Sequence, residues 1–199
     1  MNRRQFAANS LSMAVCGVAT LLGPGASEAA TKARSRGRAH VYLLRGFMNL
    51  SRGLDVLAEK LRRRGIHATV HGHGEAGALA EEAARNYKSG REGRIILIGH
   101  SMGGTAVLAM AEQLGRAGVP VALVVPIDPT STIPVSSNVR RVVNLYISNG
   151  MGTAVDRGTK FHGQLQNVDF KDRPDMGHLA IQKSDKVHQQ VIGYVLAAI

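Results

Sequence analysis

Residues 99–103 read Gly-His-Ser-Met-Gly and place a serine hydroxyl between two glycines. An apolar run, Arg94–Ile98, precedes this pattern, and a helix-forming stretch, Met102–Arg116, follows it. A strand that turns sharply into a helix holds the serine in a strained backbone conformation with its hydroxyl exposed, and glycines are needed where side chains would collide. The N–H group of Met102 would lie at the helix N-terminus, where it can stabilise an oxyanion. Ser101 is therefore the candidate nucleophile of an acyl-transfer reaction.

A serine nucleophile needs a base, and His178 is the candidate for that role. It lies between the last expected strand and the last expected helix, from where its imidazole could accept the proton of Ser101 and return it to a leaving group. Two other histidines fit less well. His162 precedes the last strand, and His188 falls within the final helix, where we expect it to be solvated.

The remaining role is that of a carboxylate that fixes the tautomer of His178 and stabilises its imidazolium form. We favour Asp128, which ends the apolar run Val121–Ile127, because the carboxyl ends of parallel strands are where such sheets carry their catalytic groups. Asp156 follows the next strand and is the alternative, although a glycine-containing loop separates it from that strand. Asp175 is close to His178 in sequence, but this proximity does not place a carboxylate behind the ring.

Strand-like and helix-like segments alternate from residue 39 to the last residue. Continuous apolar runs are typical of strands buried on both faces, and this alternation indicates a parallel sheet covered by helices on both sides. We therefore predict an α/β fold, a three-layer α/β/α sandwich with a mostly parallel sheet of about six strands. The expected strands are His40–Leu44, Ile66–Val70, Arg94–Ile98, Val121–Ile127, Val142–Ile147 and Leu165–Phe170, and the expected helices are Leu54–Leu61, Glu75–Tyr87, Met102–Arg116 and Ser184–Leu196.

The segment 39–199 resembles the α/β-hydrolase superfamily, and it is close in size to the minimal lipases and esterases that lack a lid. The resemblance rests on the pattern around Ser101, on His178 before a terminal helix, and on the loop of residues 45–47, Arg-Gly-Phe. It implies acyl transfer through an acyl-enzyme with no cofactor, and a Ser-acid-His order along the chain. The resemblance is specific for fold and nucleophile, and unspecific for the substrate.

The loop after the first strand should supply the second oxyanion donor, and the N–H group of Phe47 is the candidate. Arg45 stands where many lipases have a histidine, and it is either a clamp for a substrate carboxylate or a surface residue. His71 and His73 could suggest a metal, but no carboxylate or cysteine joins them nearby in the sequence. We expect neither a metal nor a cofactor.

The first 29 residues are typical of an export signal. Arg3 and Arg4 begin it, a short apolar stretch from Leu11 to Leu22 follows, and small residues near Ala29 suit a signal peptidase. The arginine pair favours the twin-arginine route, with the general secretory route as the alternative. We therefore expect a signal peptide at 1–29, a basic linker at 30–38 and the folded domain at 39–199, in a periplasmic or secreted protein.

The formal net charge is +11, and basic residues are concentrated before the domain. Six basic residues and one acidic residue precede Ala39, so the domain itself carries +6. Aromatic residues make up 4% and Trp is absent, which argues against a stacking platform for nucleic acid. The sequence predicts a monomeric hydrolase of small-molecule or lipid esters, with weak anionic-surface binding through the linker. A thioesterase and a non-catalytic binding module are the alternatives.

Overall fold

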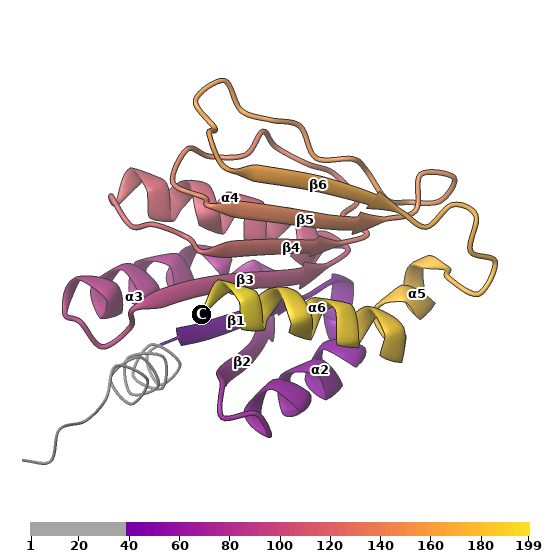
Figure 1. Cartoon of the computed structure of the whole chain (residues 1–199), viewed down its shortest axis with the longest axis horizontal. Helices are drawn as coiled ribbons and strands as arrows, with labels where there is room; N and C mark the ends of the chain where they lie inside the picture. Colours follow the sequence, from indigo (N-terminus) through magenta and orange to yellow (C-terminus); the bar gives the residue numbers. More distant parts are fainter. Residues whose placement is uncertain (1–38) are drawn as a thin grey trace, which may run out of the picture.

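Six parallel strands form the central sheet of the protein, whose computed structural model describes residues 39–199 (Figure 1). Their order across the sheet is β2-β1-β3-β4-β5-β6, and every neighbouring pair is parallel. The expected signal peptide and linker, residues 1–38, lie outside the described residues. The strands are β1 (Ala39–Arg45), β2 (His67–Gly72), β3 (Arg94–His100), β4 (Leu123–Ile127), β5 (Arg141–Tyr146) and β6 (Gln164–Asp169).

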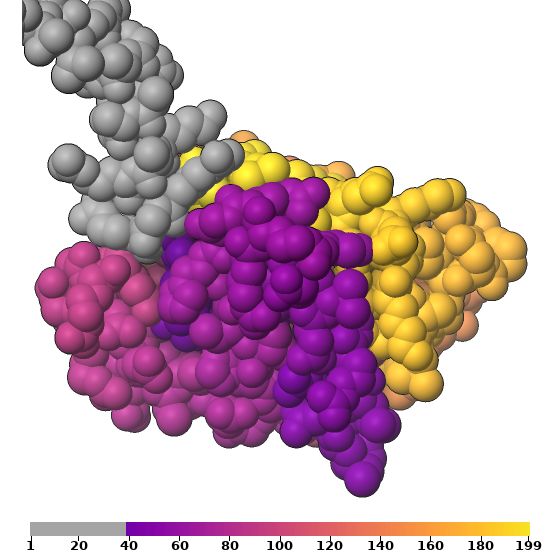
Figure 2. Space-filling model, turned by 90° about the horizontal axis from the view of Figure 1, so that it is seen from below, coloured from indigo at the N-terminus to yellow at the C-terminus, as the bar shows by residue number. Residues whose placement is uncertain are grey.

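Helices cover both faces of the sheet, so the predicted three-layer α/β/α fold is confirmed (Figure 1). One face carries α2 (Gly53–Arg62) and α6 (Asp185–Ala198), and the other carries α3 (Ala76–Lys88) and α4 (Met102–Arg116). Figure 2 shows α2, in purple, directly beside the yellow C-terminal segment. Three short elements were not predicted: the 3-10 helices η1 (Phe47–Asn49) and η2 (His73–Glu75), and the single-turn helix α5 (His178–Ile181).

The alternation of side chains along each strand divides the core into two clusters. In β1, for example, Val41 and Leu43 join the cluster beneath α2 and α6, whereas Tyr42 and Leu44 join the cluster beneath α3 and α4. A strand that is buried on both faces needs apolar side chains in both directions, which explains the continuous apolar runs in the sequence. Within residues 39–199, no helix is both long enough and apolar enough to cross a membrane.

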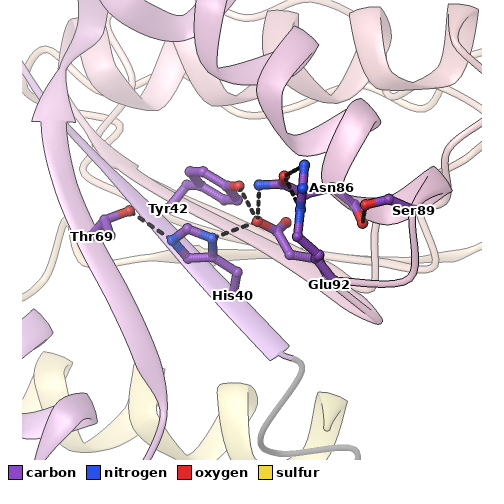
Figure 3. A network of polar contacts seen from close by, with 7 residues as sticks. His40, Tyr42, Thr69, Asn86, Ser89 and Glu92 are labelled. Carbon is purple, nitrogen blue, oxygen red and sulfur yellow. Dashed lines mark hydrogen bonds and ion pairs between the residues drawn. The ribbon is translucent and has the colours of Figure 1, made fainter.

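A buried polar network lies beneath α3, toward the amino ends of the strands (Figure 3). Glu92 is its centre, and its Oε1 atom accepts hydrogen bonds from His40 Nδ1 (2.9 Å), Tyr42 Oη (2.8 Å) and Asn86 Nδ2 (2.9 Å). The other ring nitrogen of His40 lies 2.8 Å from the hydroxyl of Thr69. Burial by itself raises the pKa of Glu92, but the hydrogen bonds from His40, Asn86 and Tyr42 outweigh it, so the pKa lies below its ordinary value.

His188 is buried rather than solvated, so the expectation for this residue was wrong. It is 1% exposed. Its Nε2 donates to the carbonyl of Gln182 at 2.8 Å, and its Nδ1 lies 3.0 Å from Nζ of Lys60. These two partners satisfy both ring nitrogens, and burial lowers the pKa of His188. The imidazole therefore joins α6 to α2 instead of facing the solvent.

Candidate active site

Ser101 lies at a sharp turn between β3 and α4, as the sequence pattern predicts. Its φ of 59° and ψ of −125° are strained for a residue with a side chain. The turn brings backbones so close together that a Cβ atom on Gly99 would lie 2.1 Å from the carbonyl oxygen of Gly103. A Cβ atom on Gly103 would lie 2.0 Å from the carbonyl oxygen of Leu44 in β1. Both glycines are therefore required for the turn that presents the hydroxyl.

Ser101, His178 and Asp128 form a continuous hydrogen-bonded series at the carboxyl edge of the sheet. The Oγ atom of Ser101 lies 3.0 Å from Nε2 of His178, and Nδ1 of His178 lies 2.6 Å from Oδ2 of Asp128. A carboxylate can only accept, so Nδ1 carries the proton and Nε2 of the neutral ring accepts from the serine. Ser101 is 8% exposed and Asp128 is fully buried. The arrangement is that of a nucleophile, a base and an orienting acid.

The position of Asp128 depends on two neighbouring segments. Its Oδ1 atom accepts a hydrogen bond from the N–H group of Ile147 at 2.8 Å, which directs Oδ2 toward His178. A Cβ atom on Gly152 would lie 1.9 Å from Oδ1, so only glycine allows this loop to pass. Asp156, the alternative acid, is exposed, and its backbone carbonyl accepts from Val135. The structure therefore brings Asp128, and not Asp156, to the histidine.

The two predicted oxyanion donors lie beside Ser101. A Cβ atom on Gly46 would lie 2.9 Å from Cβ of Ser101, so Gly46, directly before Phe47, packs closely against the nucleophile. Met102 begins α4, whose first N–H groups lack partners within the helix. Among residues 39–199, neither the N–H group of Phe47 nor that of Met102 donates a hydrogen bond to another group. Both are therefore free to bind an oxyanion.

A second polar series, which the sequence analysis missed, runs behind the nucleophile. The N–H group of Gly46 donates to Oγ of Ser51 (3.0 Å), and that hydroxyl contacts Nδ1 of His100 (2.7 Å). Nε2 of His100 contacts the carbonyl oxygen of His178 (2.8 Å). The carbonyl only accepts, so Nε2 carries the proton and Nδ1 accepts from Ser51. Desolvation by burial lowers the pKa of His100 to about 4, which keeps the ring neutral.

This series joins the oxyanion loop to the backbone of the base through His100, the residue directly before the nucleophile. A signal for it exists in the sequence, because a histidine that ends a buried strand must point into the protein. The sequence does not show that Ser51 is its partner, because 49 residues separate the two.

Arg45 forms neither a free clamp nor a solvated surface group. Its guanidinium binds the carboxylate of Asp55 on α2 through two hydrogen bonds, and 16% of its side chain is exposed. His71 and His73 lie at and just after the carboxyl end of β2, and the described residues hold no group of three or more ligands that could bind a metal. His71 does have a carboxylate nearby, since its Nδ1 lies 3.6 Å from Glu75.

A cavity of about 500 Å³ opens above Ser101. His100 and His178 are the titratable residues that line it, and no charged acid or base joins them. The rest of the lining is mostly apolar and comes from loops at the carboxyl edge of the sheet. The lining residues that the sequence analysis did not single out are Leu50, Ser51, Thr130, Met151 and Leu179. No pattern in the sequence marks them, since they come from four separate connections.

Comparison with known proteins bears on the fold and the family of the chain. A protein of unknown function from Agrobacterium tumefaciens has a similar structure, with 17% identity, a TM-score of 0.53, and coverage of 82% of this chain and 93% of that one. A protein assigned to the alpha/beta hydrolase superfamily from Xanthomonas campestris matches with 17% identity and a TM-score of 0.45, over 78% of this chain and 99% of that one. No curated protein matches the sequence significantly.

The model of the alpha/beta hydrolase family matches residues 21–189. The chain belongs to the alpha/beta hydrolase family.

Proposed function

We propose that the protein is an exported serine hydrolase that cleaves carboxylic esters through an acyl-enzyme on Ser101. The hydrogen-bonded series from Ser101 through His178 to Asp128, at the base of an open cavity, carries this proposal. The sequence of residues 1–29 supports export to the periplasm or the exterior. The apolar lining of the cavity supports an ester whose acyl or alcohol group is apolar.

In the proposed reaction, Oγ of Ser101 attacks the carbonyl carbon of the ester while its proton passes to Nε2 of His178. The oxyanion forms hydrogen bonds with the N–H groups of Met102 and Phe47. The tetrahedral intermediate collapses, the bond to the alcohol breaks, and His178 protonates the departing oxygen. A water molecule then gives a proton to Nε2 of His178 and attacks the acyl carbon. The bond from that carbon to Oγ breaks, His178 returns the proton to Oγ, and the acid leaves.

Asp128 contributes by holding the proton of His178 on Nδ1 and by stabilising the imidazolium form. Because its carboxylate is fully buried and its other oxygen is occupied by the Ile147 N–H group, it has one orientation available. That constraint keeps Nε2 directed at the serine, first to accept the proton and then to donate it.

Labelling with a fluorophosphonate probe tests the proposed nucleophile. We expect the wild-type chain to be labelled and the Ser101→Ala variant to remain unlabelled while folded. Equal labelling of both chains, or a folded wild-type chain that resists the probe, would refute the proposal. A panel of p-nitrophenyl esters with matched thioesters then separates an esterase from a thioesterase, and tight ligand retention without turnover would identify a binding module.

A further inference from the structure

Exposed apolar side chains gather at the mouth of the cavity above Ser101. Among residues 39–199, seven large apolar side chains are exposed, and six of them belong to this mouth. Five line the cavity, and the sixth, Met48, is adjacent to Phe47 in η1. We call these six the apolar rim: Phe47, Met48, Leu50, Met102, Met151 and Leu179, each between 40% and 72% exposed. Val56 on α2 is the seventh.

The backbone of η1 is strained in the conformation that presents part of this rim. Met48 has a φ of 49° and Asn49 a φ of 59°, a left-handed conformation that is unfavourable for a residue with a side chain. No residue of η1 is buried, so burial of apolar surface does not offset the strain. The strained loop instead holds Phe47 and Met48 in the solvent, next to the oxyanion donors.

Two exposed cations border the apolar rim. The N–H group of Gly53 donates to Oε1 of Gln182 at 2.6 Å, and exposed cations are the chain neighbours of these two residues, Arg52 before Gly53 and Lys183 after Gln182. Gln182 also donates to the carbonyl oxygen of Leu179, a rim residue, at 3.0 Å. The contact between Gly53 and Gln182 therefore lies next to the rim. Neither Arg52 nor Lys183 forms an ion pair within the described part of the chain.

From this placement we infer that the apolar rim and the cations Arg52 and Lys183 dock on an anionic lipid bilayer, with the cavity of Ser101 open toward the membrane. The inference rests on the proposed function and narrows its substrates to esters taken from a lipid surface. Apolar side chains insert at the boundary between headgroups and acyl chains, and neighbouring cations bind anionic headgroups. A lipid surface is the occupant that could deliver substrate while covering the cavity.

A second copy of the chain fits the same surface poorly. A symmetric dimer places the same patch of both subunits face to face, so each interface would hold Arg52 and Lys183 twice. No acid lines the cavity to compensate them, and the domain carries a net charge of +6. Such a dimer would also close both cavities.

The absence of Trp from the chain allows a test that is specific for position. Leu50→Trp places a fluorophore on the rim, and Tyr87→Trp places a reference fluorophore at a partly buried position on α3, beside a cavity at the amino ends of the strands. Both are made in the full chain with Ser101→Ala, so that no lipid is hydrolysed. Vesicles of phosphatidylcholine with phosphatidylglycerol are then added, with and without brominated lipids as quenchers.

We expect the emission of Leu50→Trp to move to shorter wavelength and to be quenched by brominated lipid, while Tyr87→Trp does not respond. Replacing both cations, with Arg52→Gln and Lys183→Gln, should lower partitioning into anionic vesicles by about 30-fold, since each cation contributes roughly 1 kcal/mol at such a surface. Val56→Ser is a control, because Val56 is an exposed apolar side chain that does not line the cavity. This substitution should leave partitioning into anionic vesicles unchanged.

Several outcomes overturn the inference. Vesicle binding without a response of Leu50→Trp would assign binding to the basic segment 30–38, and a concentration-dependent shift without lipid would assign the rim to a second copy. If the rim inserted equally well into vesicles of pure phosphatidylcholine and into anionic vesicles, Arg52 and Lys183 would have no role in docking. Labelling of Ser101 in lipid-free buffer tests the proposed function separately, so the two failures are distinguishable.

Discussion

Acidification should weaken the fold through His100, well before the carboxylates titrate. This ring is 1% exposed, and burial lowers its pKa to about 4, from an ordinary value of 6.5. Between these two values, protons bind the unfolded chain in preference to the folded one. The stability that depends on the neutral ring is therefore complete above pH 6.5 and is lost as the pH falls toward 4.

The two pKa values set the size of the effect. With one site at about 4 when folded and about 6.5 when unfolded, the free energy of unfolding at pH 5 is about 2 kcal/mol lower than at pH 8 on account of His100 alone. His100→Gln removes this titration, while its amide nitrogen can still donate to the carbonyl of His178. The stability difference between wild type and His100→Gln should therefore shrink by about 2 kcal/mol from pH 8 to pH 5.

Urea unfolding of both chains at several pH values between 5 and 8 measures this difference directly. All other titrating groups are common to the two chains and cancel in the comparison. His162→Gln, at an exposed histidine, is the control for the effect of replacing a histidine by glutamine as such. A difference between wild type and His100→Gln that does not change with pH would refute the reasoning, because it would mean that His100 is protonated to the same extent in both states.

Three further predictions concern the acid, its loop and the buried network. Asp128→Asn should slow fluorophosphonate labelling of Ser101 by up to about 10⁴-fold without unfolding the chain, because asparagine stabilises the wrong tautomer of His178; rapid labelling would remove Asp128 from the proposed role. Gly152→Ala should lower both the melting temperature and the labelling rate, because its Cβ atom would lie 1.9 Å from Oδ1 of Asp128; unchanged values in calorimetry and labelling would contradict this close approach. Glu92→Leu should lower the free energy of unfolding by roughly 3 kcal/mol or more, because it leaves buried donors without an acceptor. Labelling of Ser101 in the folded fraction should not change. If urea unfolding finds the variant as stable as the wild type, the network contributes little.

The architecture follows from local features of the sequence, which explains why it could be predicted. The runs around Ile95–Ile98 and Val121–Ile127 are apolar on both faces, a property that suits a parallel sheet between helices. The Gly-x-Ser-x-Gly pattern is also local in the sequence, and the clash that requires Gly99 arises within the turn itself, whereas the clash that requires Gly103 is with Leu44 of β1. Short elements such as α5 carry no comparable periodicity and were missed.

The partners of the candidate site could be predicted only in part, because long-range contacts select among them. Asp128 and Asp156 both follow strands, and in the structure Asp128 reaches His178, while the loop through Gly152 packs against its other oxygen. His188 shows the same limit in the core. The position of His188 in the final helix does not reveal its partners. In the structure its two ring nitrogens contact Gln182 and Lys60, which lie in two other segments.

Backbone strain in this protein is concentrated where the chemistry is proposed. Within residues 39–199, four residues other than glycine have a positive φ: Met48, Asn49, Ser101 and Asp128. Each such conformation costs of the order of 1–3 kcal/mol, and none of the four residues lies within a strand of the sheet. Two of the four hold the nucleophile and its acid, and the other two lie next to Phe47 in the loop that supplies the second oxyanion donor. The well-packed core on both faces of the sheet offsets this cost, so the geometry at the carboxyl edge is held in place by the rest of the fold.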